Sequence, residues 1–344
     1  MRMEANERFR HVEKETVLTG TLPFDACHAS TLAVLPNGDL FCAWFAGTCE
    51  GADDVAIWGA RHTKGSGWQK PKVLEQSGLP HWNPVLFVCG DGSVFLFFKI
   101  GRKIASWQTW VAVSRDECHT WSSPKELIPG NRGGRGPVRN KMIVLSNGRW
   151  LAPASLEDGR WRCFADCSDD GGASWQKSNE IFIPLYNVGT KNGCDRTIPV
   201  SEQSFTGRGA IQPTLWESSP GVVHMLMRTT EGKIFRSDSE NGGKTWCPGY
   251  ATSLPNNNSG IDLAKTDDGR LFLVYNPVGK NWGPRFPLCL SCSEDNGISW
   301  KDVYTLEAAE GEFSYPAVIF HENSLLMTYT SRRKNITFWK FDLR

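Results

Sequence analysis

The stretch SDDGGASW, Ser168–Trp175, indicates how this chain folds. It combines serine, aspartate and glycine, the residue types of tight turns, with a terminal tryptophan. Serine and aspartate side chains bond the amides of a turn, glycine permits a positive φ, and tryptophan fills space against a neighbouring sheet. A very similar stretch, SEDNGISW, occupies Ser293–Trp300. The pattern Ser-x-Asp-x-Gly-x-Ser-Trp is therefore interpreted as a repeated hairpin turn.

Three weaker copies of this turn motif precede the last one. Ser239–Trp246 has asparagine in the aspartate position, and Ser114–Trp121 has lost its glycine. Gly67–Pro71 is a fifth, badly eroded copy. The five tryptophans are spaced by 53, 54, 71 and 54 residues. A recurring period of this length indicates an architecture built from similar units that pack side by side.

A fainter repeat covers the whole chain: a polar or aromatic tag, a short apolar strand, a turn and a second strand. Runs such as Leu40–Phe45 and Leu271–Tyr275 have the β-branched and aromatic residues of strands. The tags are His28–Thr31, Trp82–Pro84, Arg139–Lys141, Gln212–Pro213, Asn257–Gly260 and Ser314–Pro316. Six units of about 57 residues fit four-stranded propeller blades. The sequence therefore predicts an all-β, six-bladed β-propeller of four-stranded antiparallel blades, as a single domain over residues 1–344.

Two connections of this propeller are expected to be unusual. After Tyr315 the chain has room for only three strands, which end with Ile336–Leu343. A strand near Glu15–Leu18 is therefore expected to supply the fourth and to close the ring. The long segment 176–209, between the third and fourth units, is predicted to form an inter-blade loop over one face.

Charge and cysteine content narrow the range of partners. The 38 basic and 37 acidic residues give a formal net charge of +1. This balance argues against nucleic acid or an anionic membrane as the main partner, since both attract a basic excess. No stretch approaches the roughly 18 uninterrupted apolar residues of a membrane span. The N-terminus has no apolar signal region, so we expect a cytoplasmic protein, or a secreted one without its signal, and eleven reduced cysteines.

Two cysteine pairs, Cys163/Cys167 and Cys289/Cys292, have the close spacing of metal ligands. No second pair or nearby histidine cluster completes four ligands, and each pair lies in an apolar, strand-like run. Buried structural thiols are the better interpretation. The sequence predicts neither a metal site nor a cofactor.

The expected pocket lies at one end of the propeller axis, where the innermost strands begin and the six tags converge. The loops between second and third strands emerge at the same end. They contain Glu50, Asp53, Asp54, Lys99, Arg102, Lys103, Glu157, Arg228, Lys280, Trp282, Arg285, Arg332 and Arg333. One face thus gathers carboxylates, cations, amides and aromatic rings, as a carbohydrate site requires.

The turn motif resembles the Asp-boxes, or BNR repeats, of the sialidase (neuraminidase) superfamily, and the resemblance covers nearly the whole chain. It implies a sialidase-like propeller in which the turn motifs lie at the periphery and have a structural role. The resemblance is closer to a broad BNR-repeat subgroup than to true sialidases. The function it implies is that of an exo-acting glycoside hydrolase that releases a terminal, acidic sugar.

The resemblance also implies roles for single residues. Asp54, or its neighbour Asp53, lies about 25 residues after the first tag, where sialidases have their acid/base aspartate. Glu50 would be the like-charged partner that raises its pKa. Tyr315 matches the place of the tyrosine nucleophile, and Arg228 matches one arginine of the carboxylate-binding triad. Further substrate contacts are expected from Asn83, Arg139, Lys141, Gln212, Asn258, Arg332 and Arg333.

Three positions depart from the sialidase pattern. His28 stands where the first triad arginine is expected, and the fifth tag has Asn258 in place of another arginine. Gln212 replaces the glutamate that activates the tyrosine. The sequence therefore predicts no three-arginine cluster, and an activity other than that of ordinary sialidases.

Two alternative functions fit the same face. A polysaccharide lyase or atypical glycosidase acting beside a uronate needs a base, an acid and a cation on the carboxylate, which His28, Tyr315 and Arg228 would supply. An unsaturated product that absorbs ultraviolet light would identify a lyase. The other alternative is a non-catalytic glycan-binding propeller, in which Asp54→Asn and Tyr315→Phe would leave binding unchanged.

Overall fold

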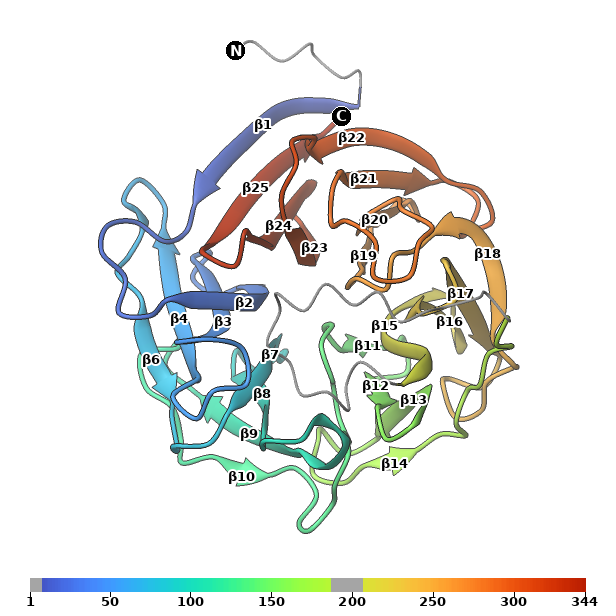
Figure 1. Ribbon diagram of the computed structural model, residues 1–344, viewed down its shortest axis with the longest axis horizontal. Coiled ribbons are helices and arrows are strands. Elements are labelled where there is room, and N and C mark those ends of the chain that lie inside the picture. Colours follow the sequence, from blue (N-terminus) through green and yellow to red (C-terminus); the bar gives the residue numbers. More distant parts are fainter. Residues whose placement is uncertain (1–7, 187–206) are drawn as a thin grey trace.

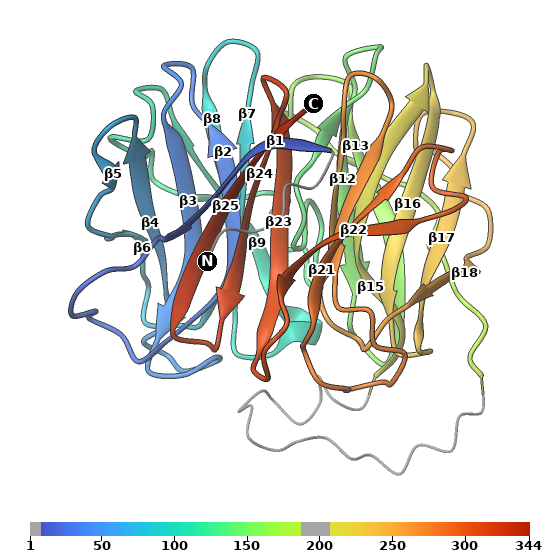
Figure 2. The same cartoon turned by 90° about the horizontal axis from the view of Figure 1, so that it is seen from above.

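The computed structural model describes residues 8–186 and 207–344, and almost all of its regular structure is β-strand. Figure 1 shows the sheets arranged as a ring around a common centre, and Figure 2 shows that their strands run along the axis of this ring. The short 3-10 helix η1 (Ile104–Ser106) is the one helix of the described residues. Within these residues no helix has the length and apolar character needed to cross a membrane. The expectation of an all-β, propeller-like fold is confirmed.

Hydrogen bonds gather the strands into five sheets. Three sheets have four strands each: β7 (His81–Val88), β8 (Val94–Ile100), β9 (Gln108–Ser114) and β10 (Lys125–Glu126); β19 (Asp262–Lys265), β20 (Leu271–Tyr275), β21 (Leu288–Ser293) and β22 (Lys301–Glu307); β23 (Phe313–His321), β24 (Ser324–Ser331), β25 (Asn335–Leu343) and β1 (Phe9–Thr16). The five-stranded sheet has β2 (Ala26–Val34), β3 (Leu40–Gly47), β4 (Ala56–Thr63), β5 (Gly67–Trp68) and β6 (Lys72–Glu75). The eight-stranded sheet has β11 (Ile143–Val144), β12 (Trp150–Leu156), β13 (Arg160–Ser168), β14 (Gln176–Lys177), β15 (Arg208–Ser219), β16 (Val222–Thr229), β17 (Lys233–Ser239) and β18 (Tyr250–Pro255).

The expectation of six separate four-stranded sheets is therefore wrong. The third and fourth sequence units share one sheet because β13 and β15 pair in parallel over Arg160–Trp161 and 208–209. Gly209 permits this approach: a Cβ atom at this position would lie 2.1 Å from the carbonyl oxygen of Trp161. Any side chain there would hold the two strands apart. The predicted loop 176–209 leads into this junction, and its central part, residues 187–206, lies outside the described residues.

The two ends of the chain share a sheet, as the sequence predicted. β1 runs antiparallel to β25, with Val12 opposite Phe341 and Thr16 opposite Thr337 (Figure 1). The strand begins at Phe9, earlier than the predicted segment 15–18. Phe9 is buried, and its ring lies 4.9 Å from that of Phe341, so apolar packing as well as hydrogen bonding joins the first strand to the last.

The core lies between the sheets, so most strands need apolar residues on both faces. β3 and β20 are buried along their whole length and read as nearly continuous apolar runs. Burial of one large aliphatic or aromatic side chain contributes roughly 1.5–3 kcal/mol. The paired cysteines belong to this core: all four are buried, and none of the ten cysteines in residues 8–186 and 207–344 forms a disulfide.

The turn motifs connect strands at the outer rim of the sheets. Between β13 and β14, the amide of Gly172 donates to Ser168 Oγ at 2.8 Å, and the amide of Ser174 donates to Asp170 Oδ1 at 2.8 Å. The corresponding bonds recur within Ser293–Trp300 at 2.9 Å each. The expected bonding of these turns by their own side chains is confirmed. No residue of these two stretches lines the pocket described below.

The tags lie just before the innermost strands or within them, and the backbone of most tags is strained. A positive φ occurs at a non-glycine residue of five tags: Ala29 (58°), Asn83 (43°), Gln212 (51°), Asn258 (60°) and Tyr315 (54°). Four of these positions coincide with a register shift in the strand pairing. Such a backbone costs on the order of 1–3 kcal/mol per residue and collects at functional sites. A bulge also changes the direction of the side chain that it carries.

Candidate functional site

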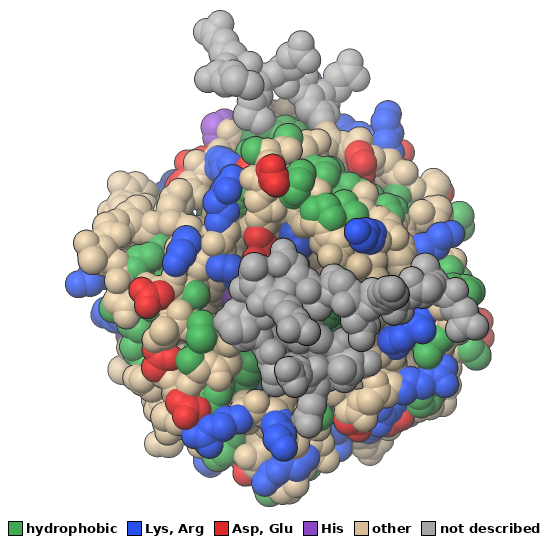
Figure 3. All heavy atoms as spheres, in the orientation of Figure 1, with side chains coloured by type: hydrophobic (Ala, Val, Ile, Leu, Met, Phe, Trp, Pro, Cys, Tyr) green, Lys and Arg blue, Asp and Glu red, His purple; other side chains and the backbone are tan. Residues whose placement is uncertain are grey.

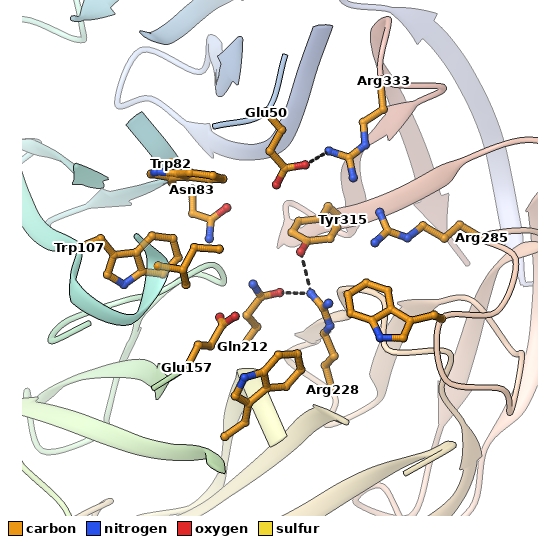
Figure 4. Close-up of a pocket in the computed structure, with 13 residues that line it drawn as sticks. Glu50, Trp82, Asn83, Trp107, Glu157, Gln212, Arg228, Arg285, Tyr315 and Arg333 are labelled. Atoms are coloured by element: carbon orange, nitrogen blue, oxygen red, sulfur yellow. Dashed lines mark hydrogen bonds and ion pairs between the residues drawn. The ribbon is translucent and has the colours of Figure 1, made fainter. Parts of the chain in front are cut away.

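A pocket of about 50 Å³ lies near the centre of the ring, where side chains from distant parts of the sequence point toward one another (Figure 4). The described face around it has acidic and basic side chains interspersed (Figure 3). The residues that line the pocket are Glu50, Trp82, Asn83, Ile104, Trp107, Glu157, Trp161, Gln212, Arg228, Trp282, Arg285, Tyr315 and Arg333.

Tyr315 is the tyrosine of this lining, and 8% of its surface is exposed. Arg228 Nη1 donates a hydrogen bond of 2.6 Å to Tyr315 Oη. The guanidinium carbons of Arg139, Arg228 and Arg285 lie 5.3, 5.4 and 5.6 Å from the centre of the tyrosine ring. These cations surround the ring and stabilise electron density on it. A charged donor on the phenol oxygen also stabilises negative charge there.

Arg228 is held in place by uncharged partners. It ends β16, and its Nε donates to Asn258 Oδ1 at 2.9 Å while Nη1 donates to Gln212 Oε1 at 2.8 Å. Both partners come from tags with positive φ, so the strained backbone aims their side chains at the arginine. Amide oxygens orient a guanidinium group without cancelling its charge. Arg228 is therefore both fixed and able to attract an anion.

Two further arginines line the pocket together with acidic partners. Arg333 forms an ion pair with Glu50 (Figure 4). Its Nε also donates to Glu312 at 2.7 Å. Arg285 Nη1 donates to the same Glu312 at 2.6 Å. Burial opposes the charge of Arg333, but Glu50 and Glu312 raise its pKa above the ordinary value. Burial likewise disfavours ionised Glu312, yet Arg285 and Arg333 hold its pKa below the usual range, so this network stays charged.

Glu157 is a buried carboxyl group of a different kind. It follows β12, and burial raises its pKa to about 7, with Arg228 opposing the shift and Glu50 adding to it. Its Oε1 has no hydrogen-bond partner within the described residues. A carboxyl that exchanges its proton near neutral pH, with one oxygen unoccupied at a pocket, is suited to general acid/base chemistry.

Aromatic rings supply the apolar walls. Trp82 donates from Nε1 to the carbonyl of Gly101 at 2.8 Å, which fixes its indole ring. The rings of Trp82 and Trp107 meet edge to face with centroids 6.0 Å apart. Trp161 and Trp282 line the pocket as well. Such a mixture of large apolar surfaces with a few fixed polar groups is typical of a small-molecule site.

The structure brings many of the predicted residues to this pocket. Glu50, Asn83, Gln212, Arg228, Tyr315 and Arg333 line it directly. Asn258 and Arg139 lie behind the lining: Asn258 holds Arg228, and Arg139 donates from Nη2 to the carbonyls of Tyr315 and Pro316. His28 is buried, with its ring 4.1 Å from that of Tyr315, and it lines a neighbouring cavity instead.

The two predicted aspartates do not belong to the pocket. Asp54 is exposed, and its Oδ2 accepts hydrogen bonds from the amide and the hydroxyl of Thr48 at 2.9 and 2.6 Å. Asp53 is exposed and forms an ion pair with Arg102 at 2.8 Å. The expectation that either residue lines the pocket is wrong, because Asp54 bonds Thr48 of its own loop and Asp53 pairs with Arg102 of the loop that follows β8.

Two predicted cations also lie elsewhere. Arg332 is exposed, donates to the carbonyl of Glu310 at 2.8 Å and packs over Phe313, while the next residue along the chain enters the pocket. Lys141 pairs with Asp262 at 2.9 Å and thereby ties the eight-stranded sheet to β19. Both residues therefore have contacts that stabilise the fold.

The prediction that no three-arginine cluster forms is wrong. Arg228, Arg285 and Arg333 line one pocket. Arg228 and Arg333 were expected to bind the substrate, and the third arginine, Arg285, comes from a loop and not from the tags His28–Thr31 and Asn257–Gly260, where the resemblance implied further arginines. Arg285 and Glu157 were already placed on that face by the strand pattern, and this was the signal that could have identified them. Glu312 belongs neither to a tag nor to a predicted loop between second and third strands.

Comparison with known proteins agrees with this architecture. Residues 38–327 match the BNR repeat-like domain, whereas no curated protein matches the chain. The solved Hadza microbial sialidase Hz136 superimposes with a TM-score of 0.72 at 17% identity, over 92% of this chain and 65% of its own. NanB sialidase from Streptococcus pneumoniae gives 0.71 at 14% identity, over 96% and 71%. A Dyadobacter fermentans protein of unknown function gives 0.74 at 15% identity, over 98% and 100%.

All three identities are low. These structural similarities therefore establish only the fold. The chain spans less than two thirds of the length of Hz136. Since the family match extends over most of the sequence, the chain belongs to the BNR repeat-like domain family.

Proposed function

We propose that this protein is an exo-acting glycoside hydrolase that releases a terminal acidic sugar. The observation that carries the proposal is the gathering of Arg228, Arg285 and Arg333 around Tyr315 in one pocket. The carboxyl groups of that lining are Glu50 and Glu157, and the second holds its proton near neutral pH. Glu50 and Glu312 are paired with Arg333 and Arg285, whereas Arg228 has uncharged partners. The positive charge of Arg228 therefore favours a ligand carboxylate, which guanidinium groups bind with paired hydrogen bonds.

Glu157 is the proposed general acid/base, in place of Asp54. Its carboxylic acid would give a proton to the leaving-group oxygen as the glycosidic bond breaks. The resulting carboxylate would take a proton from the water that adds to the anomeric carbon. Tyr315 Oη, polarised by Arg228, would stabilise the positive charge that develops on that carbon. Glu50 would position Arg333.

The sialidase comparisons support the substrate class. Trypanosoma rangeli sialidase has been solved in complex with the inhibitor DANA and in complex with 2,3-difluorosialic acid. A lyase mechanism has less support here, because His28, its expected base, lines the neighbouring cavity. Sialic acids and uronic acids share the carboxylate that the arginines would hold, and the test below includes both.

The test is the release of 4-methylumbelliferone from its glycosides with N-acetylneuraminic acid, glucuronic acid, glucose and galactose. The proposal predicts release from at least one acidic glycoside and none from the neutral two. Glu157→Gln should remove most of this activity, whereas Asp54→Asn, the matched control at an exposed acid, should retain it. Equal cleavage of neutral glycosides, or loss of activity in Asp54→Asn alone, would contradict the proposal.

A further inference from the structure

The third tag, Arg139–Lys141, differs from the other five tags in its backbone and in its position. Each of the other five has a non-glycine residue at positive φ, whereas the third tag has none. Its three residues do not line the central pocket. Arg139 and Asn140 are nevertheless buried, with 2% and 1% of their surfaces exposed. The polar groups of these two side chains therefore act on other parts of the protein.

Arg139 holds the backbone of the sixth tag. Its Nη2 donates hydrogen bonds to the carbonyl oxygens of Tyr315 and Pro316 at 2.5 and 3.0 Å. Tyr315 has a φ of 54° and lies at a register shift between β23 and β24, so its conformation needs support from outside its own sheet. Arg228 binds the same residue at Oη (Figure 4). One arginine thus fixes Tyr315 at its backbone and another at its phenol.

Asn140 holds the fourth tag in the same way. Its Nδ2 donates to the carbonyl oxygens of Gln212 and Pro213 at 3.1 and 2.9 Å. Carbonyl oxygens only accept hydrogen bonds, so the nitrogen of this amide, and not its oxygen, faces them. Gln212 has a φ of 51° and precedes a proline, as Tyr315 does. Two adjacent side chains therefore each bind two successive carbonyls of a strained dipeptide with one nitrogen.

The charge of Arg139 adds an effect that Asn140 does not have. Burial lowers the pKa of Arg139 to about 10, with Asp262 opposing the shift, so the guanidinium group is charged at neutral pH. Asp262 itself pairs with Lys141 at 2.9 Å. The guanidinium carbon of Arg139 lies 5.3 Å from the centre of the Tyr315 ring. A cation over a ring face stabilises electron density there, so Arg139 acts on the ring of Tyr315 as well as on its backbone.

We propose that Arg139 and Asn140 are the positioning residues of the site: Arg139 sets the position of Tyr315, and Asn140 sets that of Gln212 and thereby of Arg228. Gln212 Oε1 accepts a hydrogen bond from Arg228 Nη1 at 2.8 Å, so a displaced fourth tag would release this arginine. The assignment rests on the proposed function, in which Tyr315 acts in the chemical step and Arg228 binds the acidic sugar.

A crystal structure of Arg139→Met tests the position of Tyr315 without any substrate. Methionine provides neither a donor nor a charge, so Tyr315 should leave the region of positive φ and its Oη should lose the bond to Arg228. Arg149→Met is the matched control, because Arg149 is also buried and donates to a carbonyl, that of Gly242, at 3.0 Å. Tyr315 should keep its place in this control. A folded Arg139→Met protein with Tyr315 unchanged would overturn the assignment.

Asn140→Leu tests the second half of the assignment and keeps the size of the side chain. Gln212 should move, and its bond to Arg228 should be absent from the crystal structure. If Arg139→Met does not fold, Asn140→Leu decides: an unchanged bond between Gln212 and Arg228 in this variant would overturn the assignment.

Kinetics separate the two roles from a general loss of stability. Arg139→Met should lower kcat about 10–100-fold and change the Kd for the acidic sugar less than about threefold, because the arginines of the pocket remain. Arg139→Lys, which keeps a charged donor, should recover most of this loss. Asn140→Leu should instead raise the Kd about tenfold, with a smaller change in kcat. Equal changes of kcat and Kd in both variants would show a merely structural role.

The failure of this assignment is separable from that of the proposed function, because the crystal structures need no substrate. Displacement of Tyr315 in Arg139→Met, in a protein that binds and cleaves no acidic sugar, would overturn the proposed function and leave the positioning role standing. Unchanged tags in both variants of a protein that cleaves an acidic glycoside would overturn the positioning role alone.

Discussion

The outer rim and the axial end of this molecule belong to the same repeated units, but they are built in opposite ways. At the rim, Ser168 and Asp170 satisfy the amides of their own turn, and the same bonds recur in the copy at Ser293–Trp300. At the axis, the tags differ from one unit to the next, and five of them place a non-glycine residue at positive φ. Among residues 8–186 and 207–344, polar atoms there without a hydrogen-bond partner include Glu157 Oε1 and His28 Nε2.

In this repeat protein, the rim residues stabilise the fold, and the axial residues are available to a ligand. A turn whose hydrogen bonds are complete has nothing left to offer a ligand, and its repetition stabilises the ring. Strained backbone occurs at both places, since Glu117, Cys118 and Asn296 of the turn motifs also have positive φ. At the axis, however, the strained residues Asn83, Gln212 and Tyr315 line the pocket, and this marks the site.

The largest effect is expected at Glu157. Glu157→Gln keeps the size of the side chain and removes its exchangeable proton, so kcat should fall by about 10²–10⁴-fold. The Kd for an acidic sugar should change much less, because the arginines remain. Glu294→Gln, which alters an exposed rim carboxylate, is the control and should leave kcat unchanged. A full retention of kcat in Glu157→Gln would show that another group moves the proton.

The pH dependence follows from the same group. Burial raises the pKa of Glu157 from 4.5 to about 7, so the folded protein binds the proton more tightly than the unfolded chain. Its contribution to stability is fully present below pH 4.5 and is lost as the pH rises through 7. The acid form is also the proposed proton donor, so activity should decline above about pH 7. Urea unfolding of wild type and Glu157→Gln across this range should show the loss only in wild type.

A rim tryptophan should affect stability and not function. Trp246 is 6% exposed and packs with Leu145, Ile181 and Met227. Trp246→Ala should lower the free energy of unfolding by about 3–5 kcal/mol, measured by urea denaturation. Ile298→Ala, at a residue that is 77% exposed, should change it by less than about 0.5 kcal/mol. A large change in sugar affinity in the folded Trp246→Ala protein would show that rim residues also affect binding.

An axial arginine should affect binding more than a rim arginine. Arg285→Ala removes one guanidinium group from the pocket and should raise the Kd for an acidic sugar about 10–100-fold, the equivalent of one charged hydrogen bond. Arg270→Ala breaks a rim ion pair with Asp268 and should leave that Kd unchanged. Isothermal titration calorimetry distinguishes the two. Equal effects would mean that the net charge of the protein, and not this pocket, attracts the sugar.

The smallest effect is expected within a turn motif. Asp170→Ala removes the acceptor of the Ser174 amide and should cost about 1 kcal/mol of stability. The value of kcat/KM should stay within twofold of wild type. A tenfold loss of activity in Asp170→Ala would show that the rim has a functional role, contrary to this prediction.

The rim and the strands could be read from the sequence because their determinants are local. Turn residues at fixed spacing and continuous apolar runs depend on neighbours in the chain, and they predicted the propeller-like ring and its closure by β1. The fusion of two units through Gly209 was missed, because it depends on contact with Trp161, which is distant in the sequence.

The site was predicted only in part, because some of its determinants are local in the sequence and others depend on distant contacts. The tags Asn83, Gln212 and Tyr315 were found, since each begins an inner strand. Sequence position alone could not distinguish Asp54, which bonds Thr48 in its own loop, from Glu50, four residues earlier, which reaches Arg333. The direction of a loop side chain is set by partners from other sheets, and no short pattern in the sequence encodes it.

The central claim is that three arginines hold the carboxylate of a sugar at the axis. The most direct measurement is a crystal structure of the full chain soaked separately with N-acetylneuraminic acid and with glucuronic acid. The account predicts that at least one of these carboxylates accepts hydrogen bonds from two or more of Arg228, Arg285 and Arg333, with the sugar ring beside Tyr315. Binding on another surface, or an empty pocket in both crystals at saturating sugar, would contradict it.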